Sequence, residues 1–140
     1  MIKKFLYIFL CLILINSTAL ADKFVPDFKG MQTLKCDVNE TIYTENRTSV
    51  SQNKYFRIFN LDDENKKIYL QKAPIYKINY YENDKLEFKH QHLTDFYIIL
   101  SDIVIDRQTW KYTSKSTLTY DFPTYEVKYA EAEGICHLEK

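Results

Sequence analysis

The sequence predicts an all-β fold, a single-domain antiparallel meander of about eight strands that closes into a small barrel. Aromatic residues make up 16% of the chain, β-branched residues are abundant, and no stretch shows sustained helical periodicity. Several segments instead alternate between apolar and polar residues. Two cysteines lie near the two ends of the expected domain, and a bond between the strands that carry them would close the meander. A two-sheet β-sandwich with the same bond is the alternative.

The first 21 residues resemble an export signal. Lys3 and Lys4 precede an unbroken apolar run at 5–15, and Ala19-Leu20-Ala21 is a small-x-small cleavage site. The run is about half of the roughly 20 residues that a membrane-spanning helix needs, so we expect no membrane span after cleavage. The mature domain is then 22–140. The lysine-, isoleucine- and asparagine-rich composition is typical of a bacterial source, which places the protein in the periplasm or makes it secreted.

Composition excludes some classes of function. Without Lys3 and Lys4 the chain has 17 basic and 19 acidic residues, and a nucleic-acid-binding protein would need a basic face. Only Gly30 and Gly134 are glycines, so a glycine-rich phosphate loop cannot form. We expect no cofactor.

The first and last expected strands both place a cysteine on their apolar face. In 33–43 the even-numbered residues, including Cys36, form the apolar set. In 125–138 the apolar set changes from odd to even positions, which predicts a β-bulge near Tyr129 and directs Cys136 inward. Exported proteins mature where disulfides persist, so Cys36 and Cys136 are expected to be bonded.

Six further strands are expected between these two, with short polar or proline-containing connections that suit hairpins. In the sixth of them Trp110 shares the inward face with Tyr112, Leu118 and Tyr120. The six segments are Lys54–Leu61, Lys67–Gln71, Tyr76–Tyr81, Lys85–His92, Phe96–Arg107 and Trp110–Tyr120.

One group of inward-facing residues is a candidate ligand site. His90 and His92 are two residues apart, so both imidazoles project to the same side of a strand. With Glu40, Ser114 and Ser116 they could line a polar cavity, near Trp110. Polar residues where strand ends emerge into solvent are the simpler interpretation. Two histidines supply only half of a tetrahedral zinc site, so we expect no tightly bound metal. We also expect both imidazoles to be partly exposed and to titrate in their ordinary range.

No catalytic constellation is recognisable, so we expect a protein that is not an enzyme. His92 and Asp95 could be partners, but no motif places a nucleophile beside them. The 12 Tyr and 9 Phe exceed what a small core can hide, and exposed aromatic side chains suit contact with a protein or a glycan.

The segment Ile105-Asp106-Arg107-Gln108-Thr109 and the closing Gly134-Ile135-Cys136 resemble small exported bacterial β proteins of unknown function. That pattern has an Ile-Asp-Arg-x-Thr-Gly turn, and Trp110 stands here in place of its glycine. The resemblance implies a compact β domain with a terminal disulfide. The size and the cysteine positions are also similar to bacterial inhibitors of C-type lysozyme, although their Ser-Gly-x-x-Tyr segment is absent.

These observations favour an exported interaction module of the cell envelope or the extracellular space. A lipocalin-like carrier of small molecules is the first alternative, and a lysozyme-inhibitor-like protein is the second. An open lumen containing His90, His92 and Glu40 would favour the carrier. A lumen packed solid by Trp110 and its neighbours would contradict it.

Overall fold

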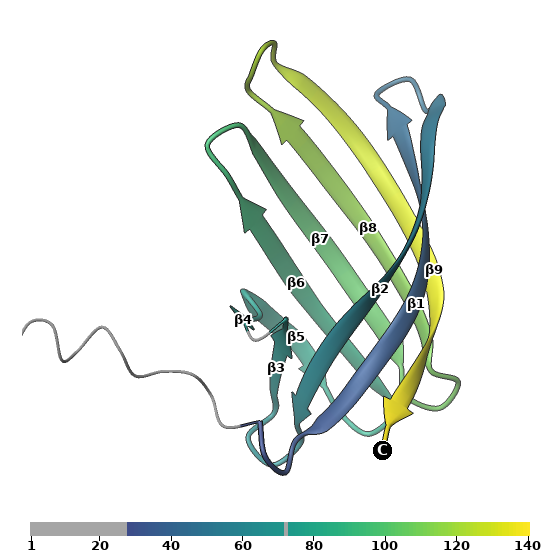
Figure 1. Cartoon of the computed structure of the whole chain (residues 1–140), viewed down its shortest axis with the longest axis vertical. Coiled ribbons are helices and arrows are strands. Elements are labelled where there is room, and N and C mark those ends of the chain that lie inside the picture. The colour runs from purple at the N-terminus through teal and green to yellow at the C-terminus, as the bar shows by residue number, and fades with distance from the viewer. Residues whose placement is uncertain (1–27, 72) are drawn as a thin grey trace, which may run out of the picture.

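The computed structural model describes residues 28–71 and 73–140, and the predicted export signal lies outside them. The described residues form one antiparallel sheet that curls into a nearly closed barrel (Figure 1). None of them belongs to a helix, so the structure contains no helical segment that could cross a membrane in this part of the chain. The strands are β1 Gln32–Thr44, β2 Ser49–Asp62, β3 Lys67–Leu70, β4 Ala73–Pro74, β5 Lys77–Tyr81, β6 Lys85–Leu93, β7 Tyr97–Asp106, β8 Lys111–Tyr120 and β9 Glu126–Glu139.

The predicted meander and its closure are confirmed. The eight expected strands correspond to all of these except the two-residue β4, and the spatial order is β4-β3-β2-β1-β9-β8-β7-β6-β5. The terminal strands β1 and β9 pair in unbroken register from Thr33 opposite Glu139 to Thr44 opposite Lys128. Because all strands belong to one continuous sheet, the sandwich alternative is wrong.

The predicted disulfide forms where the terminal strands pair. Cys36 and Cys136 are direct partners in the ladder, with sulfur atoms 1.99 Å apart, and both side chains are buried. Around them Phe59, Phe88 and Tyr112 fill the barrel, and the Phe59 and Phe88 rings meet edge to face. The packed apolar core therefore lies at the end of the barrel that contains the disulfide.

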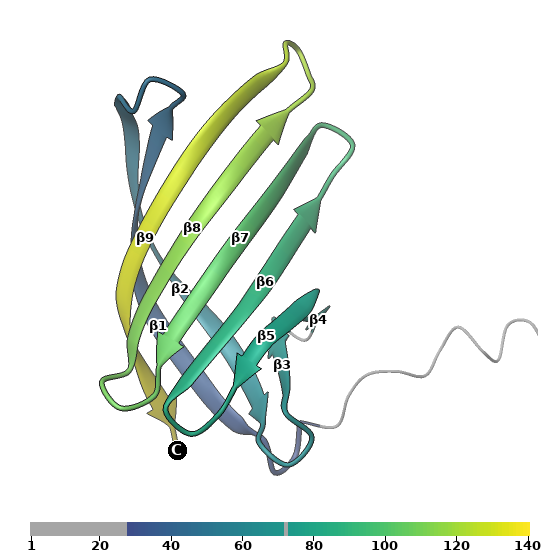
Figure 2. The same ribbon diagram turned by 180° about the vertical axis from the view of Figure 1, so that it is seen from behind.

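The barrel does not close by hydrogen bonds all the way round. The two edges of the sheet are β4 and β5, which are consecutive in the chain, and no ladder joins the β3–β4 edge to β5 (Figure 2). We call this boundary the seam. Because no backbone ladder crosses the seam, N–H and C=O groups along the two edges lack strand partners. Contacts between side chains must then hold the two edges together.

A side-chain latch holds the seam at its lower end. Arg107, in the β7–β8 turn, donates two hydrogen bonds of 3.0 and 3.2 Å to the carboxylate of Asp63 in the β2–β3 turn. It donates a third, of 3.3 Å, to the carbonyl of Glu82 after β5. The hydroxyl of Tyr81 also donates to Asp63, at 2.8 Å. Lys66 pairs with Glu82 at 2.7 Å. These contacts join both edges of the seam, and the hydrogen bonds from Arg107 are the largest cause that lowers the pKa of Asp63.

The β-bulge predicted near Tyr129 is wrong. β9 keeps a regular register with both β1 and β8 throughout. Irregularities occur instead at Ile42/Tyr43 in β1 and at Ile78/Tyr80 in β5. The apolar set changes phase because Val127 and Tyr129 point outward, so the outer face of β9 is apolar at this end.

Trp110 lies in the β7–β8 turn, at the closed lower end. Its φ is 58°, in the left-handed region that favours glycine. The Asp106 carboxylate builds the turn by accepting hydrogen bonds from the backbone of Gln108 and Thr109 at 2.8 and 2.9 Å. The indole packs against the apolar core as expected, and the Trp110 carbonyl accepts a 2.8 Å hydrogen bond from the backbone of Cys136.

Candidate functional site

Above the apolar core, the inner face of the barrel becomes polar. Glu40, His90, Ser114 and Ser116 all occupy inward positions of their strands, as predicted. Ser116 is buried and shares a 2.7 Å hydrogen bond with Ser101 of β7. These residues form a polar layer across the barrel, but their side chains belong to separate small groups and do not form one cluster.

Glu40 has its own partners inside this layer. Its carboxylate accepts a 3.0 Å hydrogen bond from the Tyr55 hydroxyl and a weaker one of 3.4 Å from Asn53. Burial is the largest cause that raises the pKa of Tyr55, and the Glu40 contacts add to it. Glu40 is thus engaged with β2 and does not contact the histidines.

The sequence analysis did not identify Arg57 of β2, which is the most unusual member of the layer. The inner face of β2 is formed by the odd-numbered residues Tyr55, Phe59 and Leu61, and Arg57 lies in the same series. Its Nη1 atom is buried without a hydrogen-bond partner, and among the described residues Arg57 forms no ion pair. Its guanidinium lies 5.4 Å from the centre of the Tyr55 ring. A charged side chain at an apolar position of the alternation was the signal that could have identified it.

A second buried polar atom lacks a partner in the same region. The Tyr112 side chain is 0% exposed, and its hydroxyl has no hydrogen-bond partner among the described residues. Burial is the largest cause that raises the pKa of Tyr112, while the charge of Arg57 lowers it. Ser114 also lowers the pKa of Tyr112, although the two hydroxyls are not in hydrogen-bonding geometry. Arg57 and Tyr112 thus leave two polar atoms of the layer unpartnered.

The expectation that both histidines titrate normally is wrong for His90. Both side chains are partly exposed as predicted, but the pKa of His90 is lowered to about 4. Burial is the largest cause, and the positive charge of Arg57 and the neighbouring His92 add to it. His92 contacts Tyr97, whose hydroxyl is 3.4 Å from Nε2, and not Asp95. No group of three potential metal ligands occurs among the described residues.

Arg57, His90 and His92 meet at the seam. Together with Leu70 and Gln71 at the end of β3, they line a cleft of about 260 Å³. One wall therefore comes from β2 and β3 on one side of the seam, and the other wall comes from β6. Of the predicted site residues, only the two histidines line this cleft. Glu40, Ser114 and Ser116 lie elsewhere in the polar layer, and Trp110 lies at the opposite end of the barrel.

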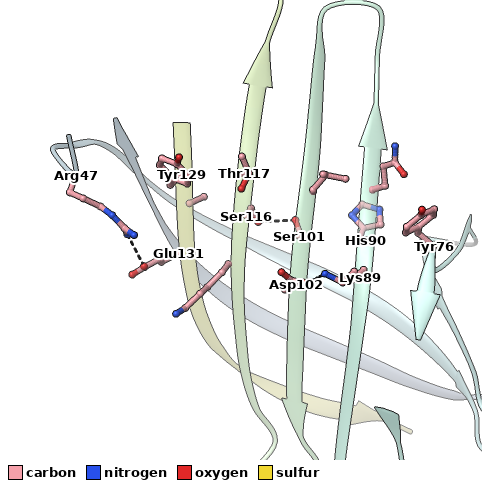
Figure 3. A pocket seen from close by; sticks show the side chains of 14 residues that line it. Arg47, Tyr76, Lys89, His90, Ser101, Asp102, Ser116, Thr117, Tyr129 and Glu131 are labelled. Carbon is pink, nitrogen blue, oxygen red and sulfur yellow. Dashed lines mark hydrogen bonds and ion pairs between the residues drawn. The ribbon is translucent and has the colours of Figure 1, made fainter. Parts of the chain in front are cut away.

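A larger concave region of about 550 Å³ is lined mainly by two outward-facing rows on either side of the row that contains Ser101 and Ser116. The two rows are Lys89, Asp102, Lys115 and Glu131, and Gln91, Leu100, Thr117 and Tyr129. Figure 3 shows Arg47 reaching from the β1–β2 turn to Glu131, and Tyr76 on the opposite side beyond His90. Four of its charged residues form ion pairs, Lys89 with Asp102 at 2.7 Å and Arg47 with Glu131 at 3.2 Å, and Lys115 lies between Asp102 and Glu131 in the ladder. Since these charges have partners, the region offers less to a charged ligand than the seam cleft does.

An exposed apolar surface forms the opposite end of the barrel from the latch. Two neighbouring rows on the outer face contribute to it: Leu93, Ile98, Thr119 and Val127 in the first, and Gln91, Leu100, Thr117 and Tyr129 in the second. The turns above add Phe96 and Phe122, whose ring centres are 5.8 Å apart, and Tyr125. Five large apolar side chains here are at least half exposed. We call this surface the upper patch, and those five side chains are Leu93, Phe96, Leu100, Phe122 and Tyr125.

Comparison with known protein families, with curated proteins and with solved structures found no match to this chain.

Proposed function

We propose that this protein is an exported, non-enzymatic binding module whose upper patch contacts another protein. The upper patch is the observation that supports the proposal. Exposed large apolar side chains that cluster at one place mark surfaces used for binding, whereas those scattered singly do not. The patch extends over four strands and two turns, and the backbone below it is held in regular register.

The chemistry of the patch favours a protein partner over a glycan. Leu93, Ile98, Leu100 and Val127 are aliphatic, and aliphatic side chains bury apolar protein surface well but give a sugar ring no flat face to stack on. Phe96 and Phe122 stand at the two turn tips, where large rings can act as anchors. Acidic Asp95 and Asp121 flank these tips, which suits a partner with basic residues around an apolar centre.

Two further features support export and a binding role. The buried disulfide is of the kind that persists in oxidising compartments such as the periplasm. The core around Phe59, Phe88 and Tyr112 fills the lower lumen, which leaves little room for a large lipocalin-type ligand.

The test uses a photo-reactive phenylalanine analogue at Phe122, with Phe56 as the matched control. Phe56 is 55% exposed but lies on β2, away from the patch. The mature protein is irradiated in an extract of the compartment where it matures. We expect an adduct of one defined mass from position 122, none from position 56, and loss of the adduct when Leu100→Asp is added.

The outcomes separate the alternatives. Leu100→Asp must leave the melting temperature close to that of the wild type, because Leu100 is half exposed and lies outside the buried core. Equal labelling at positions 56 and 122 contradicts a specific surface. An adduct with twice the mass of the chain means that the patch joins two copies of this protein and overturns the proposal of a different partner.

A further inference from the structure

The seam cleft presents hydrogen-bond donors and positive charge, and no carboxylate is among the residues that line it. The Arg57 guanidinium carries a permanent charge, and its Nη1 atom is buried with no partner. His90 is largely neutral at pH 7 because of its lowered pKa, and a neutral imidazole still offers one N–H donor. The Glu40 carboxylate of the neighbouring strand β1 does not line the cleft and is engaged by Tyr55 and Asn53.

Arg57 is half-buried, and a cation that keeps a buried nitrogen without a partner is costly, so proteins usually pair such a group with a carboxylate. The described residues supply none here, so the free protein leaves the guanidinium only partly compensated, by its contact with the Tyr55 ring. A ligand that brought an anionic group to the cleft would place negative charge beside the guanidinium and lower this cost. The planar guanidinium fork matches the two oxygens of a carboxylate or a phosphate.

A metal cation does not fit the same cleft. His90 and His92 are two possible ligands, but the charge of Arg57 stands beside them and would repel the ion. The three side chains favour a small anion for the same reason. The volume of about 260 Å³ can hold a phosphate or the acidic end of a small molecule.

We propose that the seam cleft binds an oxyanion, a carboxylate or a phosphate group, through Arg57 with His90 and His92 as additional donors. This site is distinct from the upper patch and does not depend on the proposed protein contact. Leu70 of β3 forms the apolar side of the cleft. The ligand is therefore an anionic group that is free or attached to a compact apolar body.

The experiment titrates the mature protein with inorganic phosphate and, separately, with acetate and succinate, in a buffer that contains only chloride as a competing anion. The imidazole signals of His90 and His92 are followed by NMR, and the affinity is measured by calorimetry. We expect saturable shifts of the His90 signals and an increase in melting temperature with ligand. The ligand with the highest affinity among the three shows whether phosphate or a carboxylate binds better in the cleft.

Arg57→Gln and Arg47→Gln form a matched pair of variants, because each removes one arginine charge from the barrel. Arg47 belongs to an exposed pair with Glu131 and lies outside the cleft. Arg57→Gln should weaken binding at least tenfold, whereas Arg47→Gln should leave it unchanged. If Arg57→Gln does not fold, Arg57→Lys replaces it and should weaken binding by several-fold, since it keeps the charge but loses the fork.

Three results would overturn the proposal. The first is the absence of saturable shifts with any of the three anions at up to about 20 mM, far above the affinity expected of a built site. The second is an equal loss of binding in Arg57→Gln and Arg47→Gln, which would indicate only a general charge effect. The third is binding that leaves the His90 and His92 signals unchanged, because the anion would then occupy another place.

Discussion

Replacing Arg107 tests whether side chains close the barrel where the backbone does not. The Arg107 side chain is only 10% exposed and donates two hydrogen bonds to Asp63 and one to the Glu82 carbonyl. Arg107→Gln removes the charge and the fork, and it leaves Asp63 with Tyr81 as its remaining partner. The two edges of the seam should then separate more easily at their lower end.

The size of the effect follows from burial and partner number. A hydrogen bond to a charged group contributes about 1.5–3 kcal/mol when buried. Asp63 is 43% exposed, so water screens the pair and replaces part of what is lost. We therefore expect Arg107→Gln to lower the free energy of unfolding by about 2 kcal/mol. For a domain of this size that corresponds to a fall in melting temperature of roughly 8 °C.

The assay is urea unfolding of Arg107→Gln, of Asp63→Asn and of the double variant. The coupling energy between the two sites should be about 1 kcal/mol or more. Arg47→Gln is the control, since that arginine also pairs with a carboxylate but at the surface, and it should cost less than about 0.5 kcal/mol. Hydrogen exchange should show faster opening of β3 and β5 than of β1 and β9.

Two results would refute the reasoning about the latch. One is a loss of stability in Arg107→Gln no larger than that in Arg47→Gln. The other is a coupling energy of zero with Asp63→Asn, which would mean that Arg107 acts through something other than this pair. The pH dependence gives a further check. Because the folded state lowers the pKa of Asp63, this contribution is complete above the carboxyl's unfolded value and disappears as the pH falls through the folded one.

Three more predictions follow from the fold. Replacing both Cys36 and Cys136 with Ala should cost about 3–4 kcal/mol in urea unfolding, because the bond closes a loop with a sequence separation of 100, and a loss under 1 kcal/mol would contradict this. The free energy of unfolding of Trp110→Gly in urea should be about 1 kcal/mol larger than that of Trp110→Ala, since both variants lose the indole and only Ala strains the left-handed backbone. Equal stability of the two variants would show that the strain is absent. NMR titration should place the pKa of His90 near 4, and this pKa should be higher in Arg57→Gln. Because the folded state lowers this pKa, the protein should lose stability as the pH falls from about 6.5 toward 4. An ordinary pKa for His90 would disprove its burial beside Arg57.

Alternation along the chain was enough to predict the strands, the inward cysteines and the closure by β1 and β9, because side-chain direction in a strand has a period of two. It failed at Tyr129, where the apolar set changes phase without a bulge. The rule assumes that apolar residues face the core, and β9 breaks it where the outer face becomes the upper patch. Departures of this kind are expected at surfaces used for binding.

The sequence alone determined the class of fold, the disulfide and the inward direction of Glu40, His90, Ser114 and Ser116. Only the tertiary structure decided which of them meet, because the strand pattern gives the face of a side chain but not the height of one strand against a distant one. His90 and His92 thus face Arg57 across the seam, while Glu40 pairs with Tyr55. The position of the seam, and hence of the latch and the cleft, depends on which ladder fails to form, and this follows from the curvature of the whole sheet.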